Sequence, residues 1–150
     1  MWRSPRTSDY DQVIVSLNEW WGGRSMTDML PRLFFDHFRD TSLVGVDDHG
    51  AIAAFVVAFV SPAEPDLGYV HFVGVAPERR RHGLAAAAYR ETFEMLAVRG
   101  CLRVKAVTSS SNLDSQAFHK ALGFAVSEPI VDYDGPGEDR VVLTFSLVGD

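Results

Sequence analysis

Four basic side chains stand together in an otherwise acidic sequence. The stretch VAPERRRHGLA, residues 75–85, places Arg79, Arg80, Arg81 and His82 directly before Gly83, while the whole chain carries a formal net charge of −6. Such a cluster can line an anion pocket when backbone N–H groups lie beside it, or it can be the solvated positive start of a surface helix. The neighbouring residues bear on this choice.

The cluster lies between an expected strand over 68–75, which Pro77 ends, and an expected helix over 82–99, which Gly100 closes. A helix begins with unpaired N–H groups and the positive end of its dipole. Gly83 carries no Cβ, so a ligand can approach its backbone closely. Basic residues at a helix start oppose the dipole at a cost of a few tenths of a kcal/mol each, which a bound anion would offset. The stretch therefore predicts a cradle for a phosphate or diphosphate.

The remaining pattern predicts the elements that hold this turn in place. Apolar spacing favours helices over 9–20 and 113–122, and a helix over 26–38 that Pro31 interrupts or begins. β-branched or aromatic runs favour strands on both sides of the turn DDHG, at 101–107, and in FAVSEP and RVVLTFSL. The order is two helices, two strands, then β-α-β-α-β-β. This order predicts an α/β (mixed α+β) fold in which a crossover helix packs on a mixed sheet. No repeat or linker is visible, so we expect one domain, 1–150.

Composition excludes several classes of protein. The chain is 47% hydrophobic and 23% charged, as a globular protein is, and it has no basic stripe for a nucleic acid. Its longest apolar run, 51–60, is shorter than the ~20 residues of a membrane span, and the N-terminus shows no secretory leader. The lone cysteine, Cys101, excludes an internal disulfide and fits the cytoplasm. We expect Cys101 to be a small core residue rather than an acyl carrier, and we expect no metal site.

Two stretches resemble motifs of one enzyme family. VAPERRRHGLA resembles motif A of the GNAT acyltransferases (GCN5-related N-acetyltransferases), whose pattern R/Q-x-x-G-x-G/A is matched by Arg80, Gly83 and Ala85. NLDSQAFHKALGF, 112–124, resembles motif B. Arg81 stands where many members carry a further glycine. The resemblance covers about residues 40–150 in element order, and the motifs lie at the family's usual separation.

The resemblance implies a twisted mixed sheet flanked by helices, whose fourth and fifth strands splay apart. It also implies acetyl-CoA as the donor of the acyl group, held by the splayed strand end, the motif A turn and motif B. Val73 N–H is the expected donor to the thioester oxygen. The residues expected to bind the cofactor are Phe72, Val73, Gly74, Val75, Arg80, Arg81, His82, Gly83, Leu84, Ala85, Asn112 and Phe118.

The expected chemistry is direct attack of an amine on the thioester, which needs a neutral amine and a proton for the leaving thiolate. His119 occupies the position where the family often carries a proton-donating tyrosine; the alternative is a histidine that hydrogen-bonds near a helix end. Tyr69 occupies the position of the family's usual glutamate. His71, two residues later on the same strand face, is a candidate base or, alternatively, a half-buried packing residue.

The acceptor side is expected to come from the first helices and the last loop. Trp20, Trp21 and Arg24 flank two glycines like a mobile lid, although tryptophans also pack in cores. Tyr133 and Asp134 belong to an acidic loop that would suit a cationic amine or would simply be solvated. We expect a small-molecule primary amine as the acceptor. The alternatives are a protein or peptide acceptor and a non-catalytic CoA-binding sensor module. The family is often dimeric, so a homodimer is a further expectation.

Overall fold

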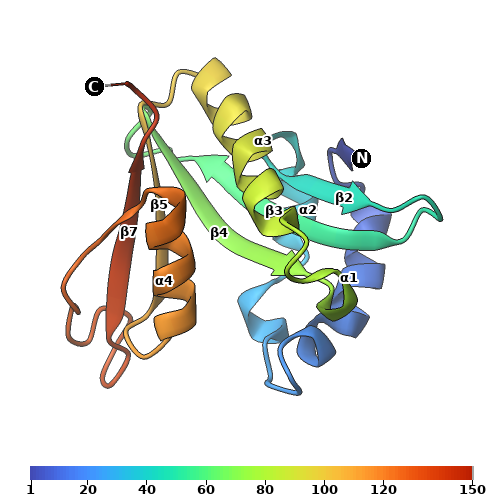
Figure 1. Ribbon diagram of the computed structural model, residues 1–150, viewed down its shortest axis with the longest axis horizontal. Helices are drawn as coiled ribbons and strands as arrows, with labels where there is room; N and C mark the ends of the chain where they lie inside the picture. Colours follow the sequence, from blue (N-terminus) through green and yellow to red (C-terminus); the bar gives the residue numbers. More distant parts are fainter. Residues whose placement is uncertain (150) are drawn as a thin grey trace. The chain divides into compact units, whose positions relative to one another are not determined.

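The computed structural model describes residues 1–149 (Figure 1). By its internal contacts the chain divides into two compact units, one of residues 1–59 and 70–96 and the other of residues 60–69 and 97 onward. Strand β4, Leu67–Val75, belongs to both, because its first three residues fall in the second unit. That residues 1–150 act as a single domain stays a prediction.

The first unit contains an antiparallel arrangement of β1 (Trp2–Arg3), β2 (Leu43–Val46) and β3 (Ile52–Val60). Nearly all of β3 is apolar and buried, which is how a strand covered on both faces is composed. The predicted turn DDHG joins β2 to β3, and Oδ1 of Asp47 accepts the N–H groups of His49 and Ala51 there. The hairpin is therefore confirmed, whereas β1 was not expected.

Helix α1, Thr7–Trp20, is confirmed close to its predicted bounds. A helix was expected over 26–38, interrupted or begun by Pro31. The structure forms an α-helix only after the proline, as α2 (Leu33–His37), with the 3₁₀ turn η1 (Thr27–Met29) before it and the 3₁₀ turn η2 (Arg39–Thr41) after it. Pro31 interrupts this stretch because a proline has no N–H to continue a helix. Buried residues from these segments join the core of the unit, which comprises Val13, Leu17, Leu30, Phe35, Val44, Ile52, Phe55, Val57 and Phe72.

Strand β4 alternates between buried and half-exposed residues from Tyr69 to Val75, so that the odd-numbered residues share the more exposed face. The 3₁₀ turn η3 (Pro77–Arg79) and helix α3 (Leu84–Val98) follow. The buried residues Ala88, Tyr89, Thr92 and Leu96 recur on one side of α3, which fixes the face that it packs. The strand, turn and helix predicted around the arginine cluster are all present.

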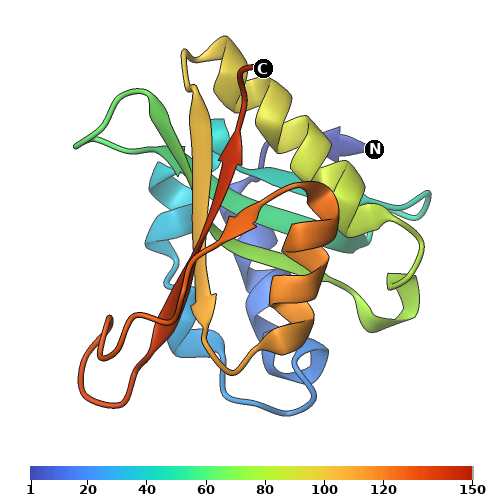
Figure 2. The same cartoon turned by 60° about the vertical axis from the view of Figure 1, so that its left-hand side comes forward.

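The second unit contains β5 (Arg103–Ser109), α4 (Leu113–Leu122), β6 (Ala125–Val126) and β7 (Arg140–Ser146). β7 runs antiparallel to β5 along seven residue pairs, from Arg103 opposite Ser146 to Ser109 opposite Arg140 (Figure 2). Asn112 caps α4, and Gly123 at φ 106° ends it. The strand order of the whole sheet is β1-β2-β3-β4-β5-β7-β6, and it confirms the predicted mixed sheet.

None of the helices within residues 1–149 combines the length and apolar character needed to cross a membrane.

Candidate functional site

The turn between β4 and α3 presents backbone donors at the start of a helix. Ala76 N–H donates to Ala53 O at 2.8 Å as the strand ends, and the first bond of α3 runs from Ala87 N to Gly83 O at 2.9 Å. The N–H groups of Leu84, Ala85 and Ala86 precede that bond and so have no acceptor within the helix. These three donors are the polar surface that the motif A turn offers to an anion.

The backbone of this turn passes twice through the left-handed region, at Arg81 (φ 64°) and at Gly83 (φ 77°). A Cβ added at Gly83 would meet nothing within 4 Å, so the space above this glycine is open. Arg81 is one of only two non-glycine residues with positive φ among residues 1–149. Because such a conformation favours glycine, the backbone explains why a glycine suits position 81.

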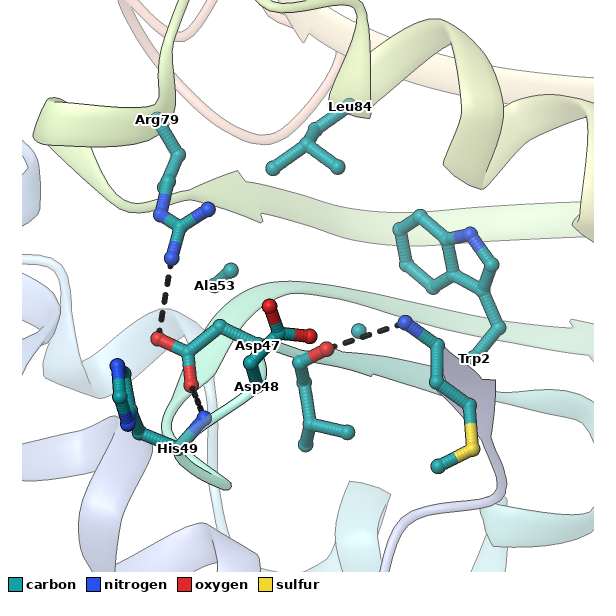
Figure 3. A pocket seen from close by; sticks show the side chains of 10 residues that line it. Trp2, Asp47, Asp48, His49, Ala53, Arg79 and Leu84 are labelled. Carbon is teal, nitrogen blue, oxygen red and sulfur yellow. Dashed lines mark hydrogen bonds and ion pairs between the residues drawn. The ribbon is translucent and has the colours of Figure 1, made fainter.

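The three arginines of the cluster do three different things. Arg79 forms an ion pair with Asp47, with its guanidinium 3.1 Å from the carboxylate Oδ2 (Figure 3). The pKa of Asp47 is lowered, first by the N–H groups of His49 and Ala51 and to a smaller extent by Arg79. The carboxylate therefore stays charged and ties the loop after β4 to the turn between β2 and β3.

Arg80 is exposed, but its side chain is tied to two backbone carbonyls. Its Nε donates to Val75 O at 3.2 Å, and its terminal NH2 group donates to Trp20 O at the end of α1. Within residues 1–149 no side-chain hydrogen bond or ion pair is formed by Arg81 or His82, and both are exposed. Of the predicted basic cluster, these two side chains remain free to meet an anion.

A cavity of about 300 Å³ lies beside the same turn (Figure 3). One wall is the indole of Trp2, which lies over Gly45 so closely that a Cβ there would fall 2.8 Å from the ring. Its remaining lining includes the Arg79–Asp47 pair and Leu84 at the start of α3. Sequence reasoning missed this cavity, because β1 has only two residues and gives no periodic signal. The lining residues are Met1, Trp2, Gly45, Val46, Asp47, Asp48, His49, Ala53, Arg79 and Leu84.

The end of β4 is shaped by aromatic packing. The ring of Phe72 is buried: it stacks on Phe55 at 5.8 Å and lies tilted against Trp21 at 5.0 Å. Only its backbone is therefore available to a cofactor. Gly74 is also buried, and a Cβ there would lie 2.4 Å from Phe55 Cε1. Val73 and Val75 flank it on the half-exposed face.

His71 is half-buried and well tied down. Its Nε2 lies 2.6 Å from Met29 O, and its ring stacks on Phe34 at 4.2 Å. Since a carbonyl only accepts, Nε2 carries the proton, and Nδ1 is the nitrogen with basic electrons. Burial lowers the pKa of His71, and the bond to Met29 offsets this only in part. The ring is therefore neutral near pH 7, and any role as a base falls to Nδ1.

Tyr69 lies near the acidic loop that was expected to bind the acceptor. Burial raises its pKa to about 12, with smaller contributions from Tyr133 and Asp134. Tyr69 thus keeps its proton at neutral pH and is a hydrogen-bond donor rather than a base. Asp134 Oδ2 accepts from Arg140 Nε at 2.8 Å, so part of the negative charge of the loop is neutralised internally. Tyr133 is 46% exposed.

His119 is buried on α4, where its Nδ1 lies 2.7 Å from Ser115 O one turn earlier. Its ring also meets Phe118 and Phe124 edge-on, at 5.4 and 4.9 Å. Burial lowers the pKa of His119, and the bond to Ser115 opposes this weakly. Nδ1 is committed to the carbonyl, so a proton for a thiolate would have to come from Nε2.

Two other predicted residues have plain structural roles. Asn112 Oδ1 accepts Ser115 N–H at 3.1 Å and thereby caps α4, which accounts for the asparagine at this position without a cofactor. Cys101 is 3% exposed, which confirms the expected small core residue.

The tryptophans at the end of α1 pack on the core rather than standing apart as a lid. Trp20 lies 6.1 Å from Phe55 and Trp21 lies 5.0 Å from Phe72, and both are half-buried. The glycines that follow have φ 66° and 87°, and Arg24 beyond them is exposed.

The first unit thus brings together Trp20, Trp21, Arg24, His71 and the predicted cofactor residues from Phe72 to Ala85. The second unit holds Tyr69 with Tyr133 and Asp134, and separately His119 with Asn112 and Phe118 on or beside α4. Across the described residues, 1–149, no group of three or more His, Cys, Asp or Glu side chains is arranged to hold a metal ion.

Comparison with known proteins gives sequence relatives that share part of the chain. A stretch of 89 residues is 36% identical to aminoglycoside N(6')-acetyltransferase type 1 of Serratia marcescens, and the match covers 51% of this chain and 61% of the relative. A stretch of 87 residues is 30% identical to L-2,4-diaminobutyric acid acetyltransferase of Shouchella clausii, covering 58% of this chain and 48% of the relative. The matches therefore span about half to three-fifths of these relatives.

A solved structure shares the fold over the whole chain. The diaminobutyrate acetyltransferase of Paenibacillus lautus, in complex with L-2,4-diaminobutyric acid and coenzyme A, superposes with a TM-score of 0.75 at 22% identity and covers 100% of this chain and 96% of that one. The sequence model of the Acetyltransferase (GNAT) family matches residues 10–124. That range includes β4, the turn with the arginine cluster, α3 and motif B, and the chain belongs to the GNAT family of acetyltransferases.

Proposed function

We propose that this protein is an N-acetyltransferase that transfers the acetyl group of acetyl-CoA to a primary amine of a small molecule. The observation that carries the proposal is the turn before α3, where three helix N–H groups lie beside an open glycine with positive φ. Such a turn is suited to a diphosphate. The family match and the curated relatives, which are acetyltransferases of aminoglycosides and of diaminobutyric acid, support the reaction.

The residues present fit the cofactor. The diphosphate would be held by the N–H groups of Leu84 and Ala85, with Arg81 supplying positive charge and the ring of His82 lying beside it in the sequence. A Cβ at Gly83 would stand in the open space that such an anion needs. Bound acetyl-CoA supplies the thioester that the amine attacks. The backbone of Val73 and Val75 is our proposed contact for the acyl arm, with Val73 N–H directed at the carbonyl oxygen.

Proton transfer has two candidate residues, each restricted to one nitrogen. His71 can accept a proton only at Nδ1, since Nε2 is bonded to Met29 O. His119 can donate to a thiolate only from Nε2, since Nδ1 is bonded to Ser115 O. Tyr69 replaces the usual glutamate with a group that is protonated at neutral pH, so we assign it a role in orienting the amine rather than in deprotonating it.

For the acceptor we propose a small amine that carries more than one positive charge. Tyr133 and Asp134 lie near Tyr69, and the surrounding loop also contains Asp132, Glu138 and Asp139. An aromatic ring beside carboxylates attracts ammonium groups. The names of the relatives describe acetyltransferases of aminoglycosides and of diaminobutyric acid, which are amines of this kind.

The test is a screen for CoA release with acetyl-CoA and a panel of aminoglycosides, diamines, diaminobutyric acid, neutral monoamines and peptides. We expect thiol release with the polycationic small amines. We also expect acetyl-CoA at 100 times its dissociation constant to raise the free energy of unfolding by about 2.7 kcal/mol. A tight CoA complex without thiol release for any amine of the panel would favour the alternative of a non-catalytic CoA-binding module. The absence of any thermal shift with acetyl-CoA would overturn the cofactor assignment.

A further inference from the structure

Arg80 joins two segments that are far apart in the sequence. Its guanidinium bonds to Val75 O at the end of β4 and to Trp20 O at the end of α1, which lies 60 residues earlier. Both carbonyls are backbone groups, so the contact does not depend on the side chains at those two positions. The side chain of Arg80 therefore spans from the motif A turn to the Trp20–Gly23 turn.

The end of α1 favours a nearby cation. The last carbonyls of a helix are unpaired and carry the negative end of the dipole. The last turn of α1 contains no basic residue. Within residues 1–149 no backbone N–H bonds to Trp20 O, although Leu17, Asn18 and Glu19 do receive such bonds. Arg80 supplies the missing donor, and its charge opposes the partial charge of the helix end.

The Trp20–Gly23 turn packs beside the end of β4. Trp20 packs on Phe55, and Trp21 packs on Phe72 of β4 itself. After the tryptophans the chain reverses at Gly22 and Gly23, both with positive φ. Backbone bonds to Asn18 O and Glu19 O close the turn on α1 itself, and the bond from Arg80 to Trp20 O is the side-chain contact that ties its start to the segment after β4.

We propose that Arg80 is a positioning residue for the acceptor: its guanidinium fixes the Trp20–Gly23 turn against β4, and the backbone amides of the motif A turn, not this side chain, hold the diphosphate. The inference rests on the proposed acetyltransferase function. It assigns the first arginine of the motif A pattern a role on the acceptor side of the reaction.

The test compares Arg80→Gln with Arg80→Lys and with Arg90→Gln, a control on α3 that removes the same charge from an exposed site. For Arg80→Gln we expect the KM of the best amine to rise about tenfold, as for loss of a charged hydrogen bond, while the KM of acetyl-CoA changes less than twofold. Arg80→Lys should recover part of the amine KM, and acrylamide should quench the tryptophan fluorescence of Arg80→Gln more strongly than that of wild type.

The outcomes separate the two proposals. A rise in the KM of acetyl-CoA with an unchanged amine KM would make Arg80 a cofactor ligand and overturn the inference, yet it would leave the acetyltransferase function in place. Unchanged values of both constants would also overturn the inference. If wild type itself releases no thiol with any amine, the proposed function fails; the quenching comparison then still tests whether Arg80 holds the tryptophan turn.

Discussion

Gly74 lies so close to Phe55 that a Cβ on the glycine would fall 2.4 Å from Cε1 of the ring. The glycine in β4 is therefore required by the core, whatever its backbone does for a cofactor. Gly74→Ala must push the Phe55 ring away from its stack with Phe72. We expect a loss of about 1–3 kcal/mol in the free energy of unfolding, measured by urea denaturation. Gly149→Ala, where a Cβ meets nothing, is the control, and equal stability of the two variants would contradict this packing.

Gly83→Val should separate cofactor binding from folding. The new side chain meets no protein atom, so the cost to stability is the positive φ alone, about 1–2 kcal/mol. Acetyl-CoA affinity, measured by calorimetry, should fall by at least about tenfold because the side chain fills the anion cradle. Gly100→Val carries the same kind of backbone strain at the far end of α3 and should bind normally. Normal binding by Gly83→Val would remove the cradle assignment.

Arg81→Gly should stabilise the protein. Arg81 has φ 64°, so a glycine relieves the steric cost of the left-handed conformation, and a net gain of up to about 1 kcal/mol remains after the extra entropy of the unfolded chain. Thermal unfolding of the variant and of wild type measures this gain. His82→Gly, at a position without positive φ, is expected to lose stability, and parallel shifts in the two variants would mean that the conformation at 81 carries no strain.

Stability should fall in mild acid because of two histidines. Burial lowers the pKa of both His71 and His119 below 6.5, so the unfolded chain binds more protons than the folded one as the pH drops. The free energy of unfolding should be level above 6.5 and decline below it. His71→Gln should make the decline shallower. The pKa of Asp9 is lowered by its hydrogen-bonded ion pair with Arg3, and that of Asp47 by the backbone N–H groups described above; both carboxylates lose stability only at lower pH, from about 3.8 downward. A slope unchanged by His71→Gln would show that the His71 pKa is not lowered.

The pH dependence of turnover can decide the role of His119. If Nε2 delivers the proton, kcat with saturating amine must decline above the lowered pKa of this histidine, because the protonated form disappears. A kcat that rises steadily with pH as the amine loses its proton would assign His119 to packing and to its bond with Ser115. His119→Phe should then keep turnover near the wild-type value.

Asp134→Asn tests the acceptor class. The change removes a carboxylate near Tyr69 and Tyr133, and it should raise the KM of a dicationic amine by up to about fivefold while affecting a monoamine less. The effect should shrink with added salt. Glu128→Gln, on an exposed residue of the same unit, is the charge control. Equal changes for monoamine and diamine would argue against a second ammonium site at this loop.

Local signals in the sequence predicted most of the fold. The hairpin around DDHG, the strand before Pro77 and the helix ended by Gly123 all follow from turn residues and periodicity. Over 26–38 the sequence predicted a helix that Pro31 interrupts or begins. The structure keeps a helix only over Leu33–His37, because Pro31 and the burial of Leu30 and Phe35 impose separate turns. β1 was missed because a strand of two residues shows no periodic pattern of apolar residues.

The site was predicted at the level of motifs and not of contacts. The sequence identified the turn before α3, but Arg79 pairs with a residue 32 positions away and Arg80 with one 60 positions away. No spacing rule reports such contacts. The bonds that restrict His71 and His119 to one nitrogen each likewise depend on carbonyls whose placement only the fold determines.

The burial of Cys101 has a practical consequence for measuring this chemistry. The chain has no other thiol, and burial raises the pKa of this one, so little reactive thiolate forms on the folded protein. A disulfide reagent added during turnover would therefore count product molecules with almost no background from the catalyst. Slow labelling of the same sulfur, followed without substrate, would then time the spontaneous opening of the unit that contains it.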